Sequence, residues 1–188
     1  MDPAPPPARV LVLAGPSGAG KSRLASRLHA RHGWPVVQLD DFYREGTDAG
    51  LPMSPLGLPD WDHVDSWDGE AALDALEQLC RQGTAHMPVY DISRSAVSGT
   101  HEVRRDGHTV VVAEGIFAAH VVAGLRERGL LAGAWCIRNQ PGRPSPGAWR
   151  ATSPSAASPR SPCGGGVTSC AAPSRVSWPR SRRSVPHR

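Results

Sequence analysis

Apolar and polar residues follow two alternating patterns along the first 140 positions. Short apolar runs predict buried strands at residues 10–14, 35–43, 110–113 and 133–137. Amphipathic stretches with helical spacing predict helices at residues 21–31, 68–83 and 117–128. Because strands alternate with helices, the pattern predicts an α/β fold in which helices flank a parallel sheet.

Two further segments interrupt this alternation. Residues 44–66 are rich in Gly, Pro and Asp, which predicts a long loop. Residues 87–92 and 100–104 are β-prone and are separated by a polar turn, which predicts a small β-hairpin insertion that stands off the main sheet. The helix before this hairpin has one apolar side, formed by Ala72, Leu73, Leu76 and Leu79.

The glycine-rich segment after the first predicted strand carries a phosphate-binding motif. The pattern G-x-x-x-x-G-K-[ST] is matched by Gly15, Pro16, Ser17, Gly18, Ala19, Gly20, Lys21 and Ser22. In this loop, the P-loop, backbone N–H groups at the positive end of a helix surround phosphate oxygens. The lysine binds the β and γ phosphates, and the serine hydroxyl is a ligand of Mg²⁺. The motif therefore predicts binding of a nucleoside triphosphate.

An accidental glycine-rich turn is the alternative interpretation of this segment. The order of strand, loop and helix argues against coincidence, because the functional motif requires that context. Lys21 is also the only lysine of the chain, since every other Lys or Arg position holds arginine. A compact ammonium group therefore stands where a phosphate needs a point charge.

Acidic residues follow two of the predicted strands. Asp40 and Asp41 lie at the end of the strand over residues 35–43, and strand ends are where open parallel sheets place their ligands. Because successive strand residues point to opposite faces, the two aspartates are not expected to share one role. Capping of the following loop is the alternative for both. Glu114 directly follows another strand, where a P-loop protein places an acid near its metal ion.

Charge is unevenly distributed along the 188 residues, which have room for one α/β domain. The chain has a net charge of +4, and residues 141–188 hold eight arginines and no acid, which leaves −4 on residues 1–140. A basic groove is therefore absent from the part that is predicted to fold. We expect no nucleic-acid partner on this ground.

The remaining composition favours a cytoplasmic protein. No apolar run is long enough to span a membrane, and the sequence "MDPAPPPA" lacks the basic and hydrophobic regions of a signal peptide. We therefore expect the four cysteines to be reduced: Cys80, Cys136, Cys163 and Cys170. Their spacing matches no zinc site.

Five segments, "GPSGAGKS", "LDDFY", "DWDHVDSWD", "MPVYDIS" and "VVVAEGIF", occur in an order and spacing that resemble the uridine kinases over about residues 9–138. Many families share the P-loop, whereas the combination of all five segments is far more specific. The resemblance implies a P-loop kinase fold, with ATP and Mg²⁺ as cofactors. It also implies transfer of the γ-phosphate to the 5′-hydroxyl of a uridine or cytidine substrate. The preferred nucleoside, the donor base and the oligomeric state stay open.

The resemblance also implies roles in catalysis. Asp40 matches the family's base, a carboxylate that orients or deprotonates the attacking hydroxyl. Lys21 is the second catalytic residue through its contact with the phosphates. Ser22 and Glu114 are the implied ligands of the metal ion.

On the acceptor side, the resemblance implies roles for three residues. Asp62 matches the family acid that holds the ribose hydroxyls, because a carboxylate can accept two O–H donors. Tyr43 and Tyr90 match aromatic positions at the nucleobase. A solvent-exposed acid and two tyrosines that only pack are the alternatives. His63 is open between a binding role and a capping or surface role.

The sequence departs from the family pattern in two places. The family hairpin often carries a histidine that contacts the nucleobase five residues after its tyrosine, and here Ser95 occupies that position. An Arg-rich lid helix is expected after the strand over residues 133–137, and no such pattern follows. The resemblance thus predicts activity that is impaired by loss of the lid.

The chain is therefore predicted to have three parts: a disordered Pro-rich N-terminus (1–8), an incomplete P-loop kinase core (9–140) and a disordered basic tail (141–188). The tail lacks Leu, Ile, Phe, Met, Lys, Asp and Glu. Its residue types have GC-rich codons, and in a shifted frame residues 145–166 can encode an Arg-rich amphipathic helix. We hypothesise a frameshift between about residues 139 and 145, and a natural low-complexity tail is the alternative.

Two functions of other classes stay open besides a uridine kinase. The first is a P-loop kinase for another small-molecule alcohol, such as a sugar. The second is a catalytically inactive module that binds ATP and engages an acidic partner through its tail. Transfer of phosphate, measured against ATP binding alone, discriminates among these functions.

Overall fold

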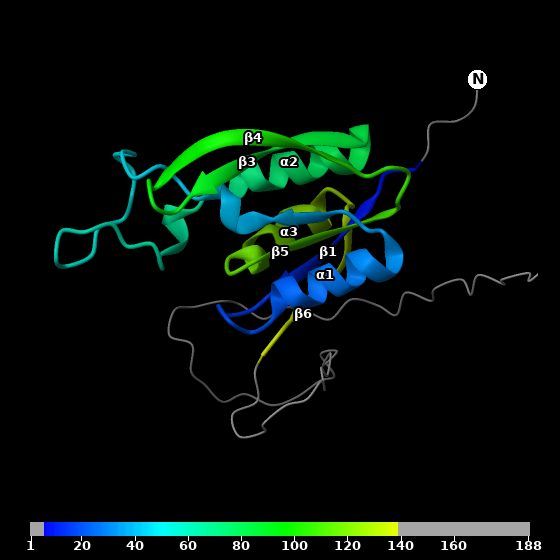
Figure 1. The fold of residues 1–188 in the computed structure, drawn as a ribbon, viewed down its shortest axis with the longest axis horizontal. Helices are drawn as coiled ribbons and strands as arrows, with labels where there is room; N and C mark the ends of the chain where they lie inside the picture. The colour runs from blue at the N-terminus through cyan, green and yellow to red at the C-terminus, as the bar shows by residue number, and fades with distance from the viewer. Residues whose placement is uncertain (1–5, 139–188) are drawn as a thin grey trace, which may run out of the picture. The chain divides into compact units, whose positions relative to one another are not determined.

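The structure, a computed structural model, describes residues 6–138. Its main sheet is parallel, with the strand order β2-β5-β1-β6 (Figure 1). These strands are β1 (Arg9–Ala14), β2 (Val36–Gln38), β5 (Val110–Gly115) and β6 (Leu131–Cys136). The fold confirms the predicted parallel sheet with flanking helices. The frameshift hypothesis, and the predictions for the tail and for most of residues 1–8, lie outside the described residues.

Helices cover both faces of this sheet. The helix α1 (Lys21–His32) packs on one face, and α2 (Gly69–Gln82) and α3 (Val121–Glu127) pack on the other (Figure 1). Strand β5 is buried along its whole length, and its alternate residues enter two separate apolar clusters. This is the pattern expected of a parallel strand that is covered on both faces. Within residues 6–138, no helix combines the length and apolar content needed to cross a bilayer.

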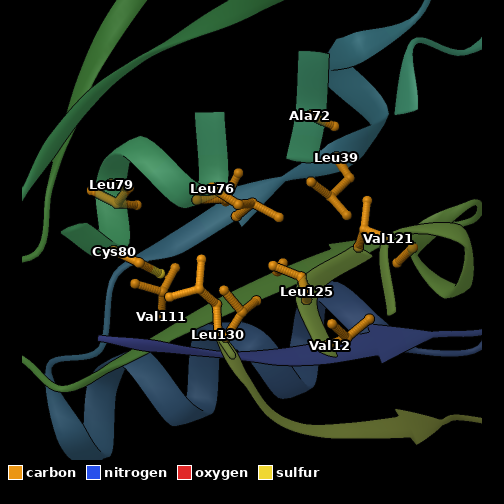
Figure 2. Close-up of a cluster of buried hydrophobic side chains, with 14 of the residues drawn as sticks. Val12, Leu39, Ala72, Leu76, Leu79, Cys80, Val111, Val121, Leu125 and Leu130 are labelled. Atoms are coloured by element: carbon orange, nitrogen blue, oxygen red, sulfur yellow. The ribbon is translucent and has the colours of Figure 1, made fainter. Parts of the chain in front are cut away.

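The larger cluster lies between the sheet and the helices α2 and α3. Leu76 of α2 points toward Leu125 of α3, and Cys80 of α2 lies beside Val111 of β5 (Figure 2). All four side chains are fully buried. The apolar side that helical spacing predicts for α2 is therefore the side that faces the core, although Leu73 is only half-buried.

The boundaries of α2 agree with the sequence signals. The side chain of Asp68 accepts a hydrogen bond from the N–H of Ala71, which caps the first turn. At the other end Gly83 adopts a left-handed conformation with φ of 89°, and its N–H donates to the carbonyl of Leu79. The helix thus begins and ends where its local chemistry indicates.

The predicted hairpin forms a second, antiparallel sheet. Strands β3 (Thr84–Asp91) and β4 (Ala96–Arg104) pair only with each other among the described residues. Ala85 and Met87 of β3 are buried against the core that includes α2 (Figure 1). The hairpin therefore stands off the main sheet, as predicted, and rests on a helix.

Two predicted elements are wrong in their extent. The strand predicted over residues 35–43 ends at Gln38, and a 3-10 helix covers Leu39–Phe42. Leu39 and Phe42 are both buried, and their spacing of three fits the period of a 3-10 turn. The helix predicted over residues 117–128 is a 3-10 turn (Ala118–His120) followed by the short α3.

Candidate active site

The carboxyl ends of the parallel strands meet at one edge of the sheet. The P-loop leaves β1, Glu114 and Gly115 end β5, and the 3-10 turn with Asp40 follows β2. Strand β5 lies between β1 and β2. Two strand spacings, about 10 Å, therefore separate the exit of β1 from the exit of β2.

The P-loop has the backbone conformation that its glycines allow. Gly15, Gly18 and Gly20 have φ angles of 147°, 72° and 91°, which side chains rarely adopt. A Cβ atom on Gly15 would also overlap the carbonyl oxygen of Ile137, which follows β6. The segment over residues 16–18 is exposed, while Ala19 is buried beneath it. The loop is thus anchored by the buried Ala19, and residues 16–18 remain exposed to solvent.

Lys21 and Ser22 form the start of α1, directly after the loop. Lys21 is 6% exposed, and its Nζ donates a hydrogen bond to the carbonyl oxygen of Pro16 at 3.2 Å. The ammonium group is therefore turned back over the loop, at the positive end of the helix. Ser22 is exposed in the first turn.

Glu114 is a buried acid at the end of β5. It is 5% exposed, and its Oε2 has no hydrogen-bond partner among the described residues. In the sheet it is paired with Leu13 of β1 on one side and Gln38 of β2 on the other. Buried polar atoms are normally satisfied, so an unpaired carboxylate oxygen at this edge indicates a missing partner such as a cation. In residues 6–138 no three His, Cys, Asp or Glu side chains gather into a metal cluster.

Asp40 bridges the exits of two strands. Its Oδ1 accepts a hydrogen bond from the N–H of Ile116 at 2.9 Å, just after β5. Gly115 permits this contact, because a Cβ atom there would lie 2.8 Å from Oδ1. The hydrogen bond goes to a neighbouring strand and not to the loop that follows Asp40. Asp41 has a different partner, the N–H of Tyr90 on β3. The two aspartates therefore diverge, although they lie on a 3-10 turn and not on a strand.

Tyr43 lies at the centre of an aromatic cluster. Its ring contacts the rings of Trp61, Tyr90 and Phe117, with centroid separations of 5.8 to 6.0 Å. Its hydroxyl donates to the carbonyl oxygen of Trp61 at 3.3 Å. This contact fixes the exposed Asp62, the next residue, beside the cluster.

Burial raises the pKa of Tyr43 to about 12, and the negative charges of Asp40 and Asp62 contribute to the same shift. The structure thus brings together Asp40, Tyr43, Asp62 and Tyr90, four of the residues that the sequence singles out. These four residues lie near the end of β2, which is separated from β1 by β5, since Asp40 follows β2. The P-loop residues and Glu114 form the other side.

Tyrosinate absorbance is expected to show this environment directly. Tyr43 should ionise near pH 12, and the part of the folding free energy that depends on its neutral form should be lost as pH rises from about 10 to about 12. Asp62→Asn is expected to lower the pKa of Tyr43, whereas Asp74→Asn, on the exposed side of α2, should leave it unchanged. Equal titration of Tyr43 in all three proteins would place Asp62 away from the cluster.

Tyr90 joins this cluster from the hairpin. Its hydroxyl donates to the carbonyl oxygen of Arg44 at 3.1 Å, and burial raises the pKa of this hydroxyl too. Both tyrosine hydroxyls are therefore occupied by backbone carbonyls. Each hydroxyl keeps acceptor lone pairs, so these residues offer a ligand their rings and a hydrogen-bond acceptor, but no free O–H donor.

Several residues of the site were not singled out from the sequence. Trp61 and Phe117 complete the aromatic cluster around Tyr43. Their signals were available, since Trp61 precedes Asp62 and Phe117 lies three residues after Glu114. His63 has the capping role that was left open, because its Nδ1 accepts the N–H of Asp65 at 3.2 Å.

Comparisons with known proteins agree with this picture. No protein-family model matches the chain. A uridine kinase of Bacillus pumilus is 29% identical over 112 residues, which cover 58% of this chain and 52% of that protein. The chain therefore spans about half the length of this curated relative. The match confirms the resemblance to uridine kinases that the motifs indicate.

Two solved structures resemble the fold. One is described as a possible uridine kinase from Bacillus stearothermophilus, with a TM-score of 0.52, 22% identity and 72% of each chain covered. The other is described as a fructose transport system kinase from Silicibacter sp. TM1040, with a TM-score of 0.50 and 23% identity over 72% of this chain and 68% of that one. These matches confirm the P-loop kinase fold.

Proposed function

We propose that this chain contains the core of an ATP- and Mg²⁺-dependent nucleoside kinase, which transfers the γ-phosphate to the 5′-hydroxyl of uridine or cytidine. The observation that carries the proposal is the order of groups along one sheet edge. The P-loop, Glu114 and Asp40 follow the adjacent strands β1, β5 and β2. Phosphoryl transfer needs a phosphate donor, a metal ion and an acceptor hydroxyl close together, and this edge brings candidate groups for all three onto adjacent strands.

The P-loop and Lys21 would hold the donor. Backbone N–H groups of the exposed loop would bind the phosphate oxygens, and the N-terminus of α1 adds a positive potential. Lys21 Nζ would exchange its contact with the Pro16 carbonyl for the β and γ phosphates. The ammonium group would thereby stabilise the negative charge that shifts during transfer.

Ser22 and Glu114 would hold Mg²⁺ near these phosphates. The unpaired buried Oε2 of Glu114 fits this assignment, because a hard cation or its bound water supplies the missing partner. When bound, Mg²⁺ would neutralise part of the negative charge of the triphosphate. The hydroxyl of Ser22 lies one residue after Lys21, as the motif requires.

The acceptor would bind on the other side of Asp40. Asp62 would accept hydrogen bonds from the ribose hydroxyls, and the rings of Tyr43 and Tyr90 would contact the nucleobase. Asp40 Oδ1 is held by the Ile116 N–H. The carboxylate is therefore oriented to accept the proton of the attacking hydroxyl as phosphate transfer proceeds.

Glu114→Gln is expected to remove the Mg²⁺ dependence of nucleotide binding. Calorimetry should show that Mg²⁺ strengthens ATP binding to the unaltered chain, and that this gain falls by about tenfold or more in the variant. Binding of ATP without Mg²⁺ should persist, since the P-loop is unchanged. Glu102→Gln, on the exposed strand β4, is the matched control. An equal Mg²⁺ response in both variants would contradict a metal role for Glu114.

We also propose that turnover is impaired, since the sequence after residue 140 has no pattern of an Arg-rich lid helix. Arginines that close over a triphosphate contribute on the order of 10³ or more to the rate of phosphoryl transfer. The expected compartment is the cytoplasm, with a small nucleoside as partner and neither nucleic acid nor membrane.

The decisive experiment is a single-turnover assay with labelled ATP, run beside a measurement of ATP binding. Slow transfer to uridine or cytidine, and none to sugars or pantothenate-like alcohols, supports the proposal. Transfer to another alcohol alone would indicate a P-loop kinase with a different acceptor. ATP binding without transfer to any acceptor would indicate an inactive ATP-binding module.

A further inference from the structure

The hairpin and the segment after β2 are joined by three hydrogen bonds. Asp41 Oδ1 accepts the N–H of Tyr90 at 3.3 Å, and the Tyr90 hydroxyl donates to the carbonyl oxygen of Arg44 at 3.1 Å. The N–H of Gly46 donates to the carbonyl oxygen of Ser95 at 2.6 Å. The main sheet makes no strand pairing with the hairpin among the described residues. On this side, these polar contacts hold the hairpin in place.

A β-bulge on β4 lies opposite Val89 and Tyr90 of β3. The register of β3 and β4 shifts between Val89 and Tyr90, so that Ser98 has no direct partner across the ladder. The Ser98 hydroxyl instead donates to the Val89 carbonyl at 3.0 Å. Bulges of this kind bend a strand and redirect the side chains beside them. The backbone N–H of Tyr90, opposite this bulge, donates to Asp41.

Asp41 is in a costly environment for a carboxyl group. It is half-buried, and this burial raises its pKa, while the Tyr90 N–H and the charge of His101 on β4 oppose the rise. The neighbouring charge of Asp40 adds to the rise. An uncharged or smaller residue would avoid this cost at the same position. What Asp41 provides at this position is a carboxylate oxygen that accepts a hydrogen bond from the hairpin.

We propose that Asp41 is a positioning residue, which latches the hairpin to the turn that carries Asp40 and so holds the Tyr90 ring beside Tyr43. Asp41 would touch neither donor nor acceptor. Its effect would reach the acceptor through Tyr90, whose ring lies 5.8 Å from that of Tyr43. The effect on nucleoside binding rests on the proposed function, whereas the latch itself is a property of the free protein.

Hydrogen exchange on the ligand-free protein tests the latch. In Asp41→Ala, exchange at the Tyr90 N–H and across the hairpin turn is expected to be about five to ten times faster, because the acceptor is lost. Asp41→Asn keeps an acceptor oxygen in the same place and should exchange like the unaltered chain. Glu102→Ala removes an exposed hairpin carboxyl and is the matched control. Should Asp41→Ala not fold, Asp41→Ser shortens the side chain and serves instead.

Binding of uridine and ATP to the same proteins tests the consequence. Asp41→Ala is expected to weaken uridine binding about five- to tenfold and to leave ATP binding unchanged, and Asp41→Asn should restore uridine binding. Equal loss of both ligands would mean a general structural role and would overturn the proposal. Unchanged hydrogen exchange in Asp41→Ala would overturn it as well. If the unaltered chain binds no nucleoside, the proposed function fails, and hydrogen exchange alone decides the latch.

Discussion

Lys21→Ala is expected to abolish phosphate transfer and to weaken ATP binding strongly. Lys21 is the one lysine of the chain, is almost fully buried, and is turned over the P-loop by its bond to the Pro16 carbonyl. Alanine removes the positive charge from the place where the β and γ phosphates would lie. Removal of one group that stabilises developing charge costs about 10²- to 10³-fold in rate. Single-turnover transfer and calorimetric ATP binding measure the two effects.

The fold of the Lys21→Ala variant should persist, because alanine is a better helix former than lysine at the start of α1. Arg23→Ala is the matched control, since Arg23 is an exposed cation two residues further along the same helix. It should leave both transfer and binding within a small factor of the unaltered chain. Equal losses in the two variants would show that helix charge in general, and not the P-loop ammonium, is responsible.

Asp40→Asn is expected to lower the transfer rate by about 10²- to 10⁴-fold, the range that general base catalysis supplies. Asparagine keeps an oxygen that can accept the Ile116 N–H, so the exits of β2 and β5 should stay joined. It cannot accept the proton of an attacking hydroxyl. ATP binding should therefore remain as it is, while single-turnover transfer to uridine falls.

The pattern of loss in Asp40→Asn separates a catalytic role from a structural one. Thermal unfolding should shift little, because the Ile116 N–H keeps an acceptor oxygen in the variant. Asp65→Asn provides the control, because Asp65 is exposed in the 3-10 turn (Val64–Ser66) that follows Asp62. Full transfer by Asp40→Asn would contradict the assignment of the base, even if the chain phosphorylates uridine.

Local chemistry explains why much of this structure was predictable. The P-loop depends on positive φ angles that glycine permits, and the glycines at positions 15, 18 and 20 indicate those angles in the sequence. The helix α2 has a capping aspartate, an apolar side and a glycine stop within one short segment. Strands β1 and β5 are buried on both faces and so read as continuous apolar runs. In each case the deciding interactions lie within a few residues of one another.

Features that depend on distant contacts were predicted less well. The residues Leu39 to Phe42 have strand-like composition, but burial of both Leu39 and Phe42 favours a 3-10 turn. Phe117 has a helical neighbourhood, yet its ring joins Tyr43 and Trp67, which lie far away in the sequence. The roles of Asp40 and Asp41 could be distinguished only when β5 and the hairpin were in place. No periodic pattern in one segment contains that information.

The close approach of Gly15 to the Ile137 carbonyl has an evolutionary consequence. Because the obstacle is main chain from another strand, selection for a foldable protein alone would retain glycine at position 15. A descendant that had ceased to use nucleotides would still carry this letter of the motif. Lys21 touches main chain only through the flexible end of its side chain, at the Pro16 carbonyl, so drift at position 21 would be the earlier genetic sign of a lineage that had abandoned catalysis.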